Sequence, residues 1–248
     1  MKDDHGESID QMRSWTLTGW GISIACLHRL SRVRAYVPPH IQIQPVLPGL
    51  TLGGYYGLHY HDSPIGPYDE LVVFPALVSF GGRVGCYVSH RFVNSERALS
   101  ARWPSWHGPR ELRRIETSRE DRQWRFEMFE AGHVAFAARG RIIAPAFPFH
   151  FSVPFIDDVS GQIVWYSGLF DTEIQLTTAR VIIDPESQLG RLKPGRRLFS
   201  IGFRSLRIAL GDPITVTESL VRPLVRAAPA MSIQGVAQLY AERGDIPM

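Results

Sequence analysis

Residues 61–75 read HDSPIGPYDELVVFP, a rigid turn that runs directly into a strongly apolar strand. The prolines and the glycine of SPIGP enforce the turn, because proline fixes φ and glycine accepts conformations that other residues avoid. In the strand that follows, Tyr68, Glu70 and Val72 share one face, and the residues between them share the other. The carboxylate of Glu70 can therefore be aimed into a cavity from the start of this strand.

Strand-like segments continue in both directions from this stretch. They are rich in Val, Ile, Tyr, Phe and Thr and are separated by turn residues, drawn from 22 glycines and 18 prolines. The predicted strands cover 18–28, 40–46, 50–61, 69–80, 84–92, 123–129, 132–143, 147–155, 161–168, 172–183 and 196–209. So many strands predict a mainly β (α+β) protein built from large antiparallel sheets.

Helical spacing is convincing in two places only. Residues 94–102 open on an Asn or Ser cap, with Glu96 in the first turn, where the helix dipole favours a carboxylate. Apolar residues also recur at helical spacing over 215–244, where Pro223 and Pro229 predict a division into short helices. No internal repeat is visible, which argues against propellers and solenoids.

Composition limits the function classes. With 248 residues, of which 44% are hydrophobic, the chain can bury a sizeable core, and no linker composition divides it. We therefore expect a polar N-terminal arm over 1–14 and a single domain over 15–248. The net charge of +3 comes without a basic block, a zinc pattern or an aromatic RNA-binding signature, so no nucleic-acid partner is predicted.

The cysteines and the early apolar run predict a cytoplasmic protein. Cys26 and Cys86 are too far apart for a disulfide framework or a metal-type pair, which favours a reducing compartment. Residues 15–27 are apolar but too short to span a bilayer, and an acidic segment precedes them instead of a basic one. No membrane association is expected.

The order of motifs along the chain resembles the acetoacetate decarboxylase superfamily. YVPPHIQIQPVLPGLTLGG (36–54) supplies a Val-Pro segment, 61–75 supplies a Ser-Pro-x-Gly-Pro-Tyr-x-Glu turn, and 82–115 supplies a short helix with an Ala-Leu pair and a proline-bearing turn. The resemblance runs from about residue 15 to the C-terminal helix. It implies a closed, cone-like barrel around a hydrophobic cavity, with a few flanking helices, and a homo-oligomer.

One position departs from this pattern in a chemically decisive way. In the decarboxylases that the chain resembles, a lysine after the turn proline forms a Schiff base with a β-keto acid. Here Pro109 is followed by Arg110 and Glu111, and a guanidinium stays protonated and cannot act as an amine nucleophile. The chain has only two lysines, Lys2 in the arm and Lys193 in a turn. The resemblance therefore implies the pocket without its covalent chemistry.

The predicted catalytic residues are Glu70, Arg110 and His61. Glu70 beside Arg110 would form a charge-assisted pair that orients a carbonyl or carboxylate or moves a proton; the alternative is a buried salt bridge that only holds the turn. His61 is a reserve acid or base, although an exposed or packing role is the alternative for both His59 and His61. Their His-x-His spacing lacks a firm third ligand, so no metal is predicted.

Aromatic residues are frequent where the family fold would line its cavity. Those predicted to bind substrate are Trp20, Tyr56, Tyr68, Trp106 and Phe149, and the alternative for each is a place in the core. If they face a cavity, they suit a bulky apolar substrate, such as a polyketide or terpenoid, whose developing positive charge their π-faces can stabilise.

The sequence thus predicts a cofactor-independent enzyme of secondary metabolism, a cyclase, isomerase or lyase, that acts on a small apolar molecule without an imine. Two alternatives stay open. One is a non-catalytic small-molecule binding protein on the same fold. The other is a decarboxylase of β-keto acids in which Arg110 stabilises an enolate without a Schiff base.

Overall fold

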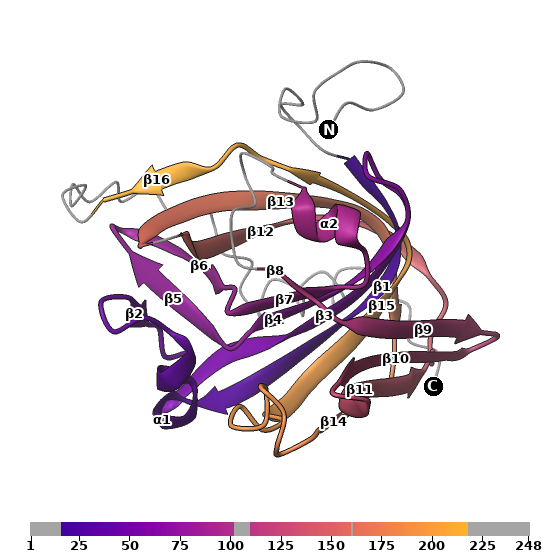
Figure 1. The fold of residues 1–248 in the computed structure, drawn as a ribbon, viewed down its shortest axis with the longest axis horizontal. Coiled ribbons are helices and arrows are strands. Elements are labelled where there is room, and N and C mark those ends of the chain that lie inside the picture. The colour runs from indigo at the N-terminus through magenta and orange to yellow at the C-terminus, as the bar shows by residue number, and fades with distance from the viewer. Residues whose placement is uncertain (1–15, 102–109, 160, 218–248) are drawn as a thin grey trace, which may run out of the picture.

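Long β-strands dominate the computed structural model, which describes residues 16–101, 110–159 and 161–217 (Figure 1). The helical elements are α1 (Leu30–Val33), the 3-10 helix η2 (Arg34–Tyr36) and α2 (Glu96–Ser100). The strands are β1 (Thr16–Arg29), β2 (Gln42–Ile43), β3 (Leu50–Asp62), β4 (Tyr68–Phe74), β5 (Ala76–Phe80), β6 (Arg83–Tyr87), β7 (His90–Val93), β8 (Arg110–Leu112), β9 (Arg114–Glu120), β10 (Gln123–Glu130), β11 (His133–Arg141), β12 (Phe147–Val159), β13 (Gln162–Leu176), β14 (Arg180–Ile183), β15 (Arg196–Leu210) and β16 (Ile214–Val216). The prediction of a mainly β fold is confirmed.

Most strands belong to one 12-stranded sheet. Its order is β2-β5-β6-β12-β13-β15-β1-β3-β4-β7-β8, and β16 pairs with β13. Pairing is antiparallel except between β12 and β6 and between β7 and β8. A second, four-stranded sheet has the order β14-β11-β10-β9.

A bent hairpin joins the two ends of the large sheet. β4 continues into β5 through Pro75, and β6 continues into β7 through residues 88–89, so the hairpin belongs to both ends of the strand order. Thr51 of β3 adds a link, because its Oγ1 accepts a hydrogen bond of 3.2 Å from the Leu77 backbone nitrogen. The sheet therefore curls back on itself, with β12 and β13 arching over β3 and β4 in Figure 1.

The two faces of β4 face two different cores. Tyr68 and Val72 pack with aromatic residues of β12, β13 and β15, and we call this side of the curled sheet the inner face. Leu71 and Val73 pack instead against the second sheet. Alternation along β4 therefore places Glu70 on the inner face, as its spacing predicts.

The second sheet approaches β3 closely because Gly57 has no side chain. A Cβ at this position would lie 2.7 Å from the Phe126 ring of β10. Phe126 and Phe136 fill this interface together with Tyr55 of β3, all nearly inaccessible to solvent.

Several element boundaries differ from those predicted. Pro75, which has no backbone N–H, divides the segment predicted as one strand over 69–80. β13 runs unbroken over Gln162–Leu176, where two strands are predicted. The charged run after Pro109 forms β8 and β9, because its alternate side chains are solvated while Ile115 is buried.

The helix predicted at 94–102 is confirmed in shorter form as α2. Ser95 is its N-cap, and its Oγ accepts a hydrogen bond from the Ala98 backbone nitrogen. The polar arm lies outside the described residues, as does 218–244 of the segment predicted to be helical; its first residues, 215 and 216, are instead part of the strand β16. Within the described ranges, no helix is long and apolar enough to cross a membrane.

Candidate active site

Glu70 is a carboxyl group enclosed on the inner face. It lies beside Leu58 of β3, is 0% exposed, and its Oε2 accepts a hydrogen bond of 3.3 Å from the hydroxyl of Tyr60. Among the described residues, none hydrogen-bonds to its Oε1. One oxygen of this buried carboxyl group is thus held by Tyr60, and the other makes no hydrogen bond to a described residue.

Arg91 of β7 is the centre of a second buried group. Its Nη1 lies 3.0 Å from Asp157 Oδ2 of β12, and its Nη2 donates a hydrogen bond to the hydroxyl of Tyr166 on β13. The Tyr166 hydroxyl donates in turn to Asp157 Oδ2 at 3.4 Å. All three side chains are almost fully buried, so the curl of the sheet joins strands from distant positions of its order.

The surroundings shift the proton affinities of these groups. Burial raises the pKa of Glu70 above its ordinary value, although Arg91, Arg110 and the Tyr60 hydroxyl oppose the rise. Burial also raises the pKa of Tyr60 well above its ordinary value, so its hydroxyl stays a donor. Glu70 can therefore take up and release a proton closer to neutral pH than an exposed carboxyl group.

Arg110 belongs to the same cluster of charges. It begins β8, pairs in register with Arg91, and its Nη1 donates to the carbonyl oxygens of Ala98 at 3.0 Å and Ala101 at 2.8 Å. Burial lowers the pKa of Arg110, and the nearby charge of Glu70 opposes this effect. The structure thus brings the predicted partners together and adds Arg91, which sequence reasoning missed.

Sequence patterns carried weak signals for the missed residues. Arg91 lies inside a predicted strand and is two positions from Val93, which is buried, so the two side chains share the inward face. A charged residue on such a face is rare, which makes it a signal of function. Asp157 lies beyond the predicted end of its strand at 155, whereas β12 continues to Val159. Nothing in the sequence alone pairs Tyr166 with either of them.

The predicted aromatic residues divide between two surroundings. Tyr56 and Tyr68 are buried on the inner face; Tyr56 stacks on Phe74 with ring centroids 4.7 Å apart, and Tyr68 lies 4.8 Å from Tyr60. Phe149 is half-buried and packs against the same cluster. These three rings give the inner face an apolar wall.

Trp20 and Trp106 are placed differently. Trp20 is half-buried, and its ring lies 5.5 Å from the ring of His59, with the guanidinium of Arg119 above it at 6.0 Å. Trp106 lies outside the described residues. The structure therefore does not bring Trp20 to Glu70.

The histidines at the end of β3 also differ in their surroundings. His61 is exposed, three positions beyond Leu58, the neighbour of Glu70, and the structure does not bring it to the cluster. His59 Nδ1 instead lies 2.7 Å from Asp69 Oδ1. In the part of the chain that the structure describes, no three His, Cys, Asp or Glu side chains converge as a metal site.

Lys193 is the one lysine among the described residues. Lys193 is exposed in a turn with a φ of 49°, on the loop that precedes β15, and Lys2 lies outside the described residues. No lysine of the described ranges lies in the cluster of Glu70, Arg91 and Arg110.

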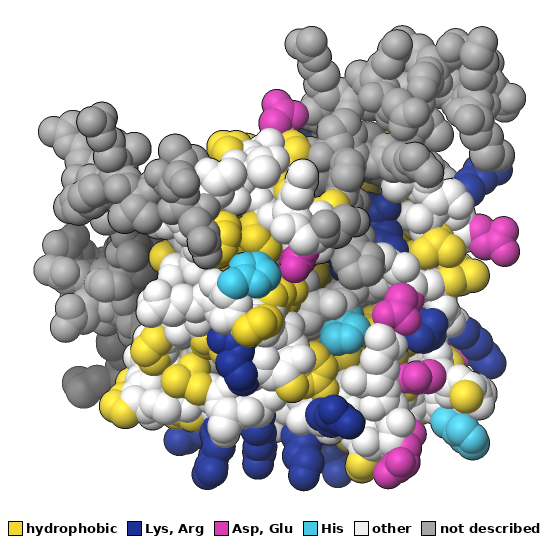
Figure 2. Space-filling view, turned by 60° about the vertical axis from the view of Figure 1, so that its left-hand side comes forward, with side chains coloured by type: hydrophobic (Ala, Val, Ile, Leu, Met, Phe, Trp, Pro, Cys, Tyr) yellow, Lys and Arg dark blue, Asp and Glu magenta, His cyan; other side chains and the backbone are white. Residues whose placement is uncertain are grey.

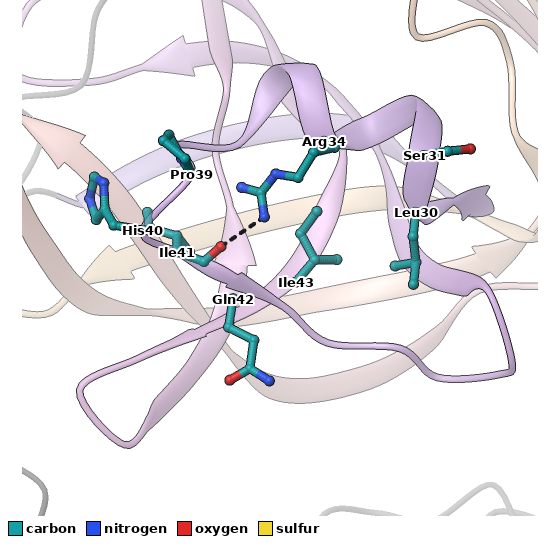
Figure 3. Close-up of a pocket in the computed structure, with 8 residues that line it drawn as sticks. All are labelled: Leu30, Ser31, Arg34, Pro39, His40, Ile41, Gln42 and Ile43. Carbon is teal, nitrogen blue, oxygen red and sulfur yellow. Dashed lines mark hydrogen bonds between the residues drawn. The ribbon is translucent and has the colours of Figure 1, made fainter.

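Three pockets lie away from Glu70. One, of about 580 Å³, is lined by α1, η2 and β2; Figure 3 shows Arg34 pointing in it toward the carbonyl of Ile41, 3.1 Å away. Arg34 also donates to the carbonyls of Val37 and Pro38, so it braces this loop. A second pocket lies on β9–β11 and a third beside His28.

Comparisons with solved structures identify the fold. The enduracididine biosynthesis enzyme MppR with bound HEPES matches with a TM-score of 0.68 and 14% identity, over 87% of this chain and 92% of its own. Acetoacetate decarboxylase from Legionella pneumophila matches with a TM-score of 0.66 and 13% identity, over 89% and 94%. The chain has the acetoacetate decarboxylase-like fold. The resemblance carried by residues 61–75 is therefore confirmed at the level of the fold.

An acetoacetate decarboxylase-like enzyme from Sphingomonas wittichii RW1 also matches this fold, with a TM-score of 0.57 and 14% identity, over 87% of this chain and 97% of its own. No family model matches the sequence.

Sequence comparison adds shorter matches to plant proteins. Protein NEOXANTHIN-DEFICIENT 1 of Arabidopsis thaliana is 30% identical over 98 residues, which cover 40% of this chain and 32% of that protein. The rice protein of the same name is 31% identical over 98 residues. The match thus spans about a third of the length of these curated relatives.

Proposed function

We propose that this acetoacetate decarboxylase-like chain is an enzyme of secondary metabolism that acts on a bulky apolar substrate, of polyketide or terpenoid type, as an isomerase, cyclase or lyase. It works by acid–base and hydrogen-bond catalysis, without a cofactor and without an imine. The observation that carries the proposal is Glu70, a fully buried carboxyl group with one oxygen left without a partner among the described residues, beside two arginines.

The chemistry follows from the residues of the cluster. Glu70 removes a proton from a carbon beside a carbonyl group; the C–H bond breaks and its electron pair moves to the carbonyl oxygen, which becomes an enolate. The fixed charges of Arg91 and Arg110 stabilise this enolate. Return of the proton to a different carbon completes an isomerisation and leaves Glu70 as it began. Tyr60 keeps the carboxyl group in place through its hydrogen bond to Oε2.

An apolar substrate class is supported by two observations. The inner face around Glu70 carries the rings of Tyr56, Tyr68 and Phe149, which offer contact area and few polar groups. The plant relatives bear the name NEOXANTHIN-DEFICIENT 1, and neoxanthin is a carotenoid, a terpenoid with a long apolar polyene chain. A biosynthetic role, as distinct from the substrate class, is supported by MppR, which shares the fold and is named as a biosynthesis enzyme.

The test uses proton exchange, because it needs no knowledge of the final product. Wild-type protein is incubated in D₂O with a panel of terpenoid and polyketide ketones, and deuterium uptake beside the carbonyl is followed by NMR. We expect uptake from at least one ketone, and a loss of at least roughly a hundredfold in Glu70→Gln and in Arg110→Gln. The exposed Glu186→Gln serves as the matched control and should keep the wild-type rate.

Uptake that survives both substitutions would remove the proposed site. Borohydride trapping with a β-keto acid should leave the protein unlabelled, since no lysine of the described residues lies in the cluster of Glu70, Arg91 and Arg110. Labelling at Lys193 would contradict an imine-free mechanism.

A second candidate, a non-catalytic binding protein, is favoured by the Arg91–Asp157–Tyr166 group. These side chains contact one another and resemble a structural ion pair. Saturable binding of a ketone without deuterium uptake would select this candidate. Release of CO₂ from a β-keto acid in an Arg110-dependent manner would instead select the imine-free decarboxylase.

The remaining expectations belong to the same proposal. We propose a homo-oligomer in the cytoplasm, with one domain over 15–248 and a small molecule, not a nucleic acid, as partner. Light scattering on the purified full chain tests the oligomeric state.

A further inference from the structure

A pocket of about 310 Å³ lies where β1 runs into α1. Segments far apart in the sequence form it, and its lining residues are Leu27, His28, Arg29, Arg32, Leu50, Pro194, Gly195 and Arg196. Figure 2 shows Lys and Arg side chains along the lower edge of the molecule, the end at which Figure 1 places α1. The pocket therefore opens in a strongly basic region.

Three guanidinium groups line this pocket, and no acidic side chain does. Arg29, Arg32 and Arg196 are exposed, and within the described ranges none of them forms an ion pair with a carboxylate. The contrast with Arg34 is direct, because that guanidinium is occupied by three backbone carbonyls. Like charges gathered without a counter-charge attract an anion.

His28 supplies the enclosed part of the pocket wall. It is 2% exposed, and its Nε2 has no hydrogen-bond partner among the described residues. Burial and, to a lesser extent, the charge of Arg32 lower the pKa of His28 to about 4, so the ring is neutral near neutral pH. A neutral ring carries one N–H, so His28 can offer a single donor to the pocket that it lines.

Gly195 allows the turn before β15 to lie against this histidine. A Cβ at this position would come within 2.8 Å of His28 Nδ1 and 2.7 Å of the Leu27 carbonyl oxygen. The backbone therefore brings Arg196 to the same small space as Arg29, which the sequence separates by 167 positions, the difference between the two residue numbers.

We propose that this pocket binds a phosphate group, either of a free phosphate or diphosphate or of a phospholipid head. A phosphate carries up to two charges and several acceptor oxygens, which match three guanidinium forks; a carboxylate would neutralise only one of them. The site is separate from the Glu70 cluster, so its failure or success is independent of the proposed enzymatic activity.

Calorimetric titration of the full chain with inorganic pyrophosphate and with inorganic phosphate tests the proposal. We expect saturable binding, and a dissociation constant raised at least roughly tenfold in the double variant Arg29→Gln/Arg196→Gln. Arg207→Gln removes an equal charge per substitution from the same strand β15 and should leave the constant unchanged. Circular dichroism checks that each variant is folded.

Co-sedimentation with vesicles distinguishes the two sources of phosphate. Binding to phosphatidylcholine vesicles that contain phosphatidic acid, but not to phosphatidylcholine alone, identifies a lipid head group when pyrophosphate gives no heat. If the double variant does not fold, Arg196→Lys keeps the charge but loses the fork, and should still weaken binding.

Absence of binding to both phosphates and to the anionic vesicles would overturn the proposal. An equal loss in Arg207→Gln would also overturn it, because the attraction would then be general and not located in this pocket.

Discussion

Glu70 owes its chemistry to its surroundings. Asp69, the next residue along the chain, points to the other face of β4, where His59, Asn94 and Thr117 all bond its carboxylate. Glu70 has one hydroxyl donor and otherwise only nearby positive charges. Two adjacent carboxyl groups thus differ in their number of hydrogen-bond donors, because a strand presents them to opposite faces.

A pH profile tests the state of Glu70. Because burial raises its pKa above 4.5, a base at this position becomes protonated as the pH falls toward 4.5 from above. We expect the exchange rate to fall on the acid side with an apparent pKa above 4.5. An acid limb at or below 4.5 in the wild-type protein would contradict the assignment.

His28 gives a second pH-dependent prediction, for stability. Its pKa is about 4 in the folded protein and 6.5 in a free side chain, so the unfolded state binds the proton first as the pH falls. The free energy of unfolding should therefore decrease by roughly 3 kcal/mol between pH 6.5 and 4 through this group. The free energy of unfolding is measured in urea at several pH values. Its decrease between pH 6.5 and 4 should be smaller by this amount in His28→Phe, and the exposed His133→Asn should show the same decrease as the wild-type protein.

The packing of the second sheet on β3 depends on one missing side chain. Gly57 sits directly under the Phe126 ring, which is 1% exposed and belongs to the core between the two sheets. The sheet-to-sheet distance is thus set by a glycine on one element and an aromatic ring on the other.

Gly57→Ala should lower the free energy of unfolding by about 1–3 kcal/mol, the usual cost of overpacking. Phe126→Leu replaces the ring with a smaller side chain. In the double variant, Gly57→Ala should therefore lower the free energy of unfolding clearly less than it does alone. Denaturant unfolding of the four proteins measures this coupling, and additive effects would show that the contact does not limit the packing.

The curl of the large sheet brings together groups that no local pattern connects. Arg91, Asp157 and Tyr166 come from β7, β12 and β13, and their contacts cross the interior of the fold. An ion pair so deeply buried adds little net stability, but removal of one member leaves a charge without compensation.

Asp157→Asn should therefore cost about 3–5 kcal/mol of unfolding free energy. The double variant Arg91→Met/Asp157→Leu should recover much of this loss. Glu116→Gln, which breaks the exposed pair with Arg114, is the control and should cost less than about 1 kcal/mol. A small effect of Asp157→Asn would show that the inner face is open to water.

Local patterns were enough for much of the fold. Alternation placed Glu70 on an inward face, the SPIGP turn fixed the start of β4, and the cap at Ser95 located α2, because each depends on residues close in the chain. The sequence alone shows that residue 110 is an arginine. No structure is needed to conclude that an amine nucleophile is absent at this position.

Tertiary structure alone decided which charges meet. Arg91, which is close to Glu70, lies 21 positions further along the chain. Asp157, the partner of Arg91, lies on β12, which extends beyond its predicted end. It also placed Trp20 and His61 away from the cluster and gathered Arg29 and Arg196 at one pocket. Contacts between distant strands depend on how the whole sheet curls, a property of the summed packing of two cores that no single stretch of sequence contains.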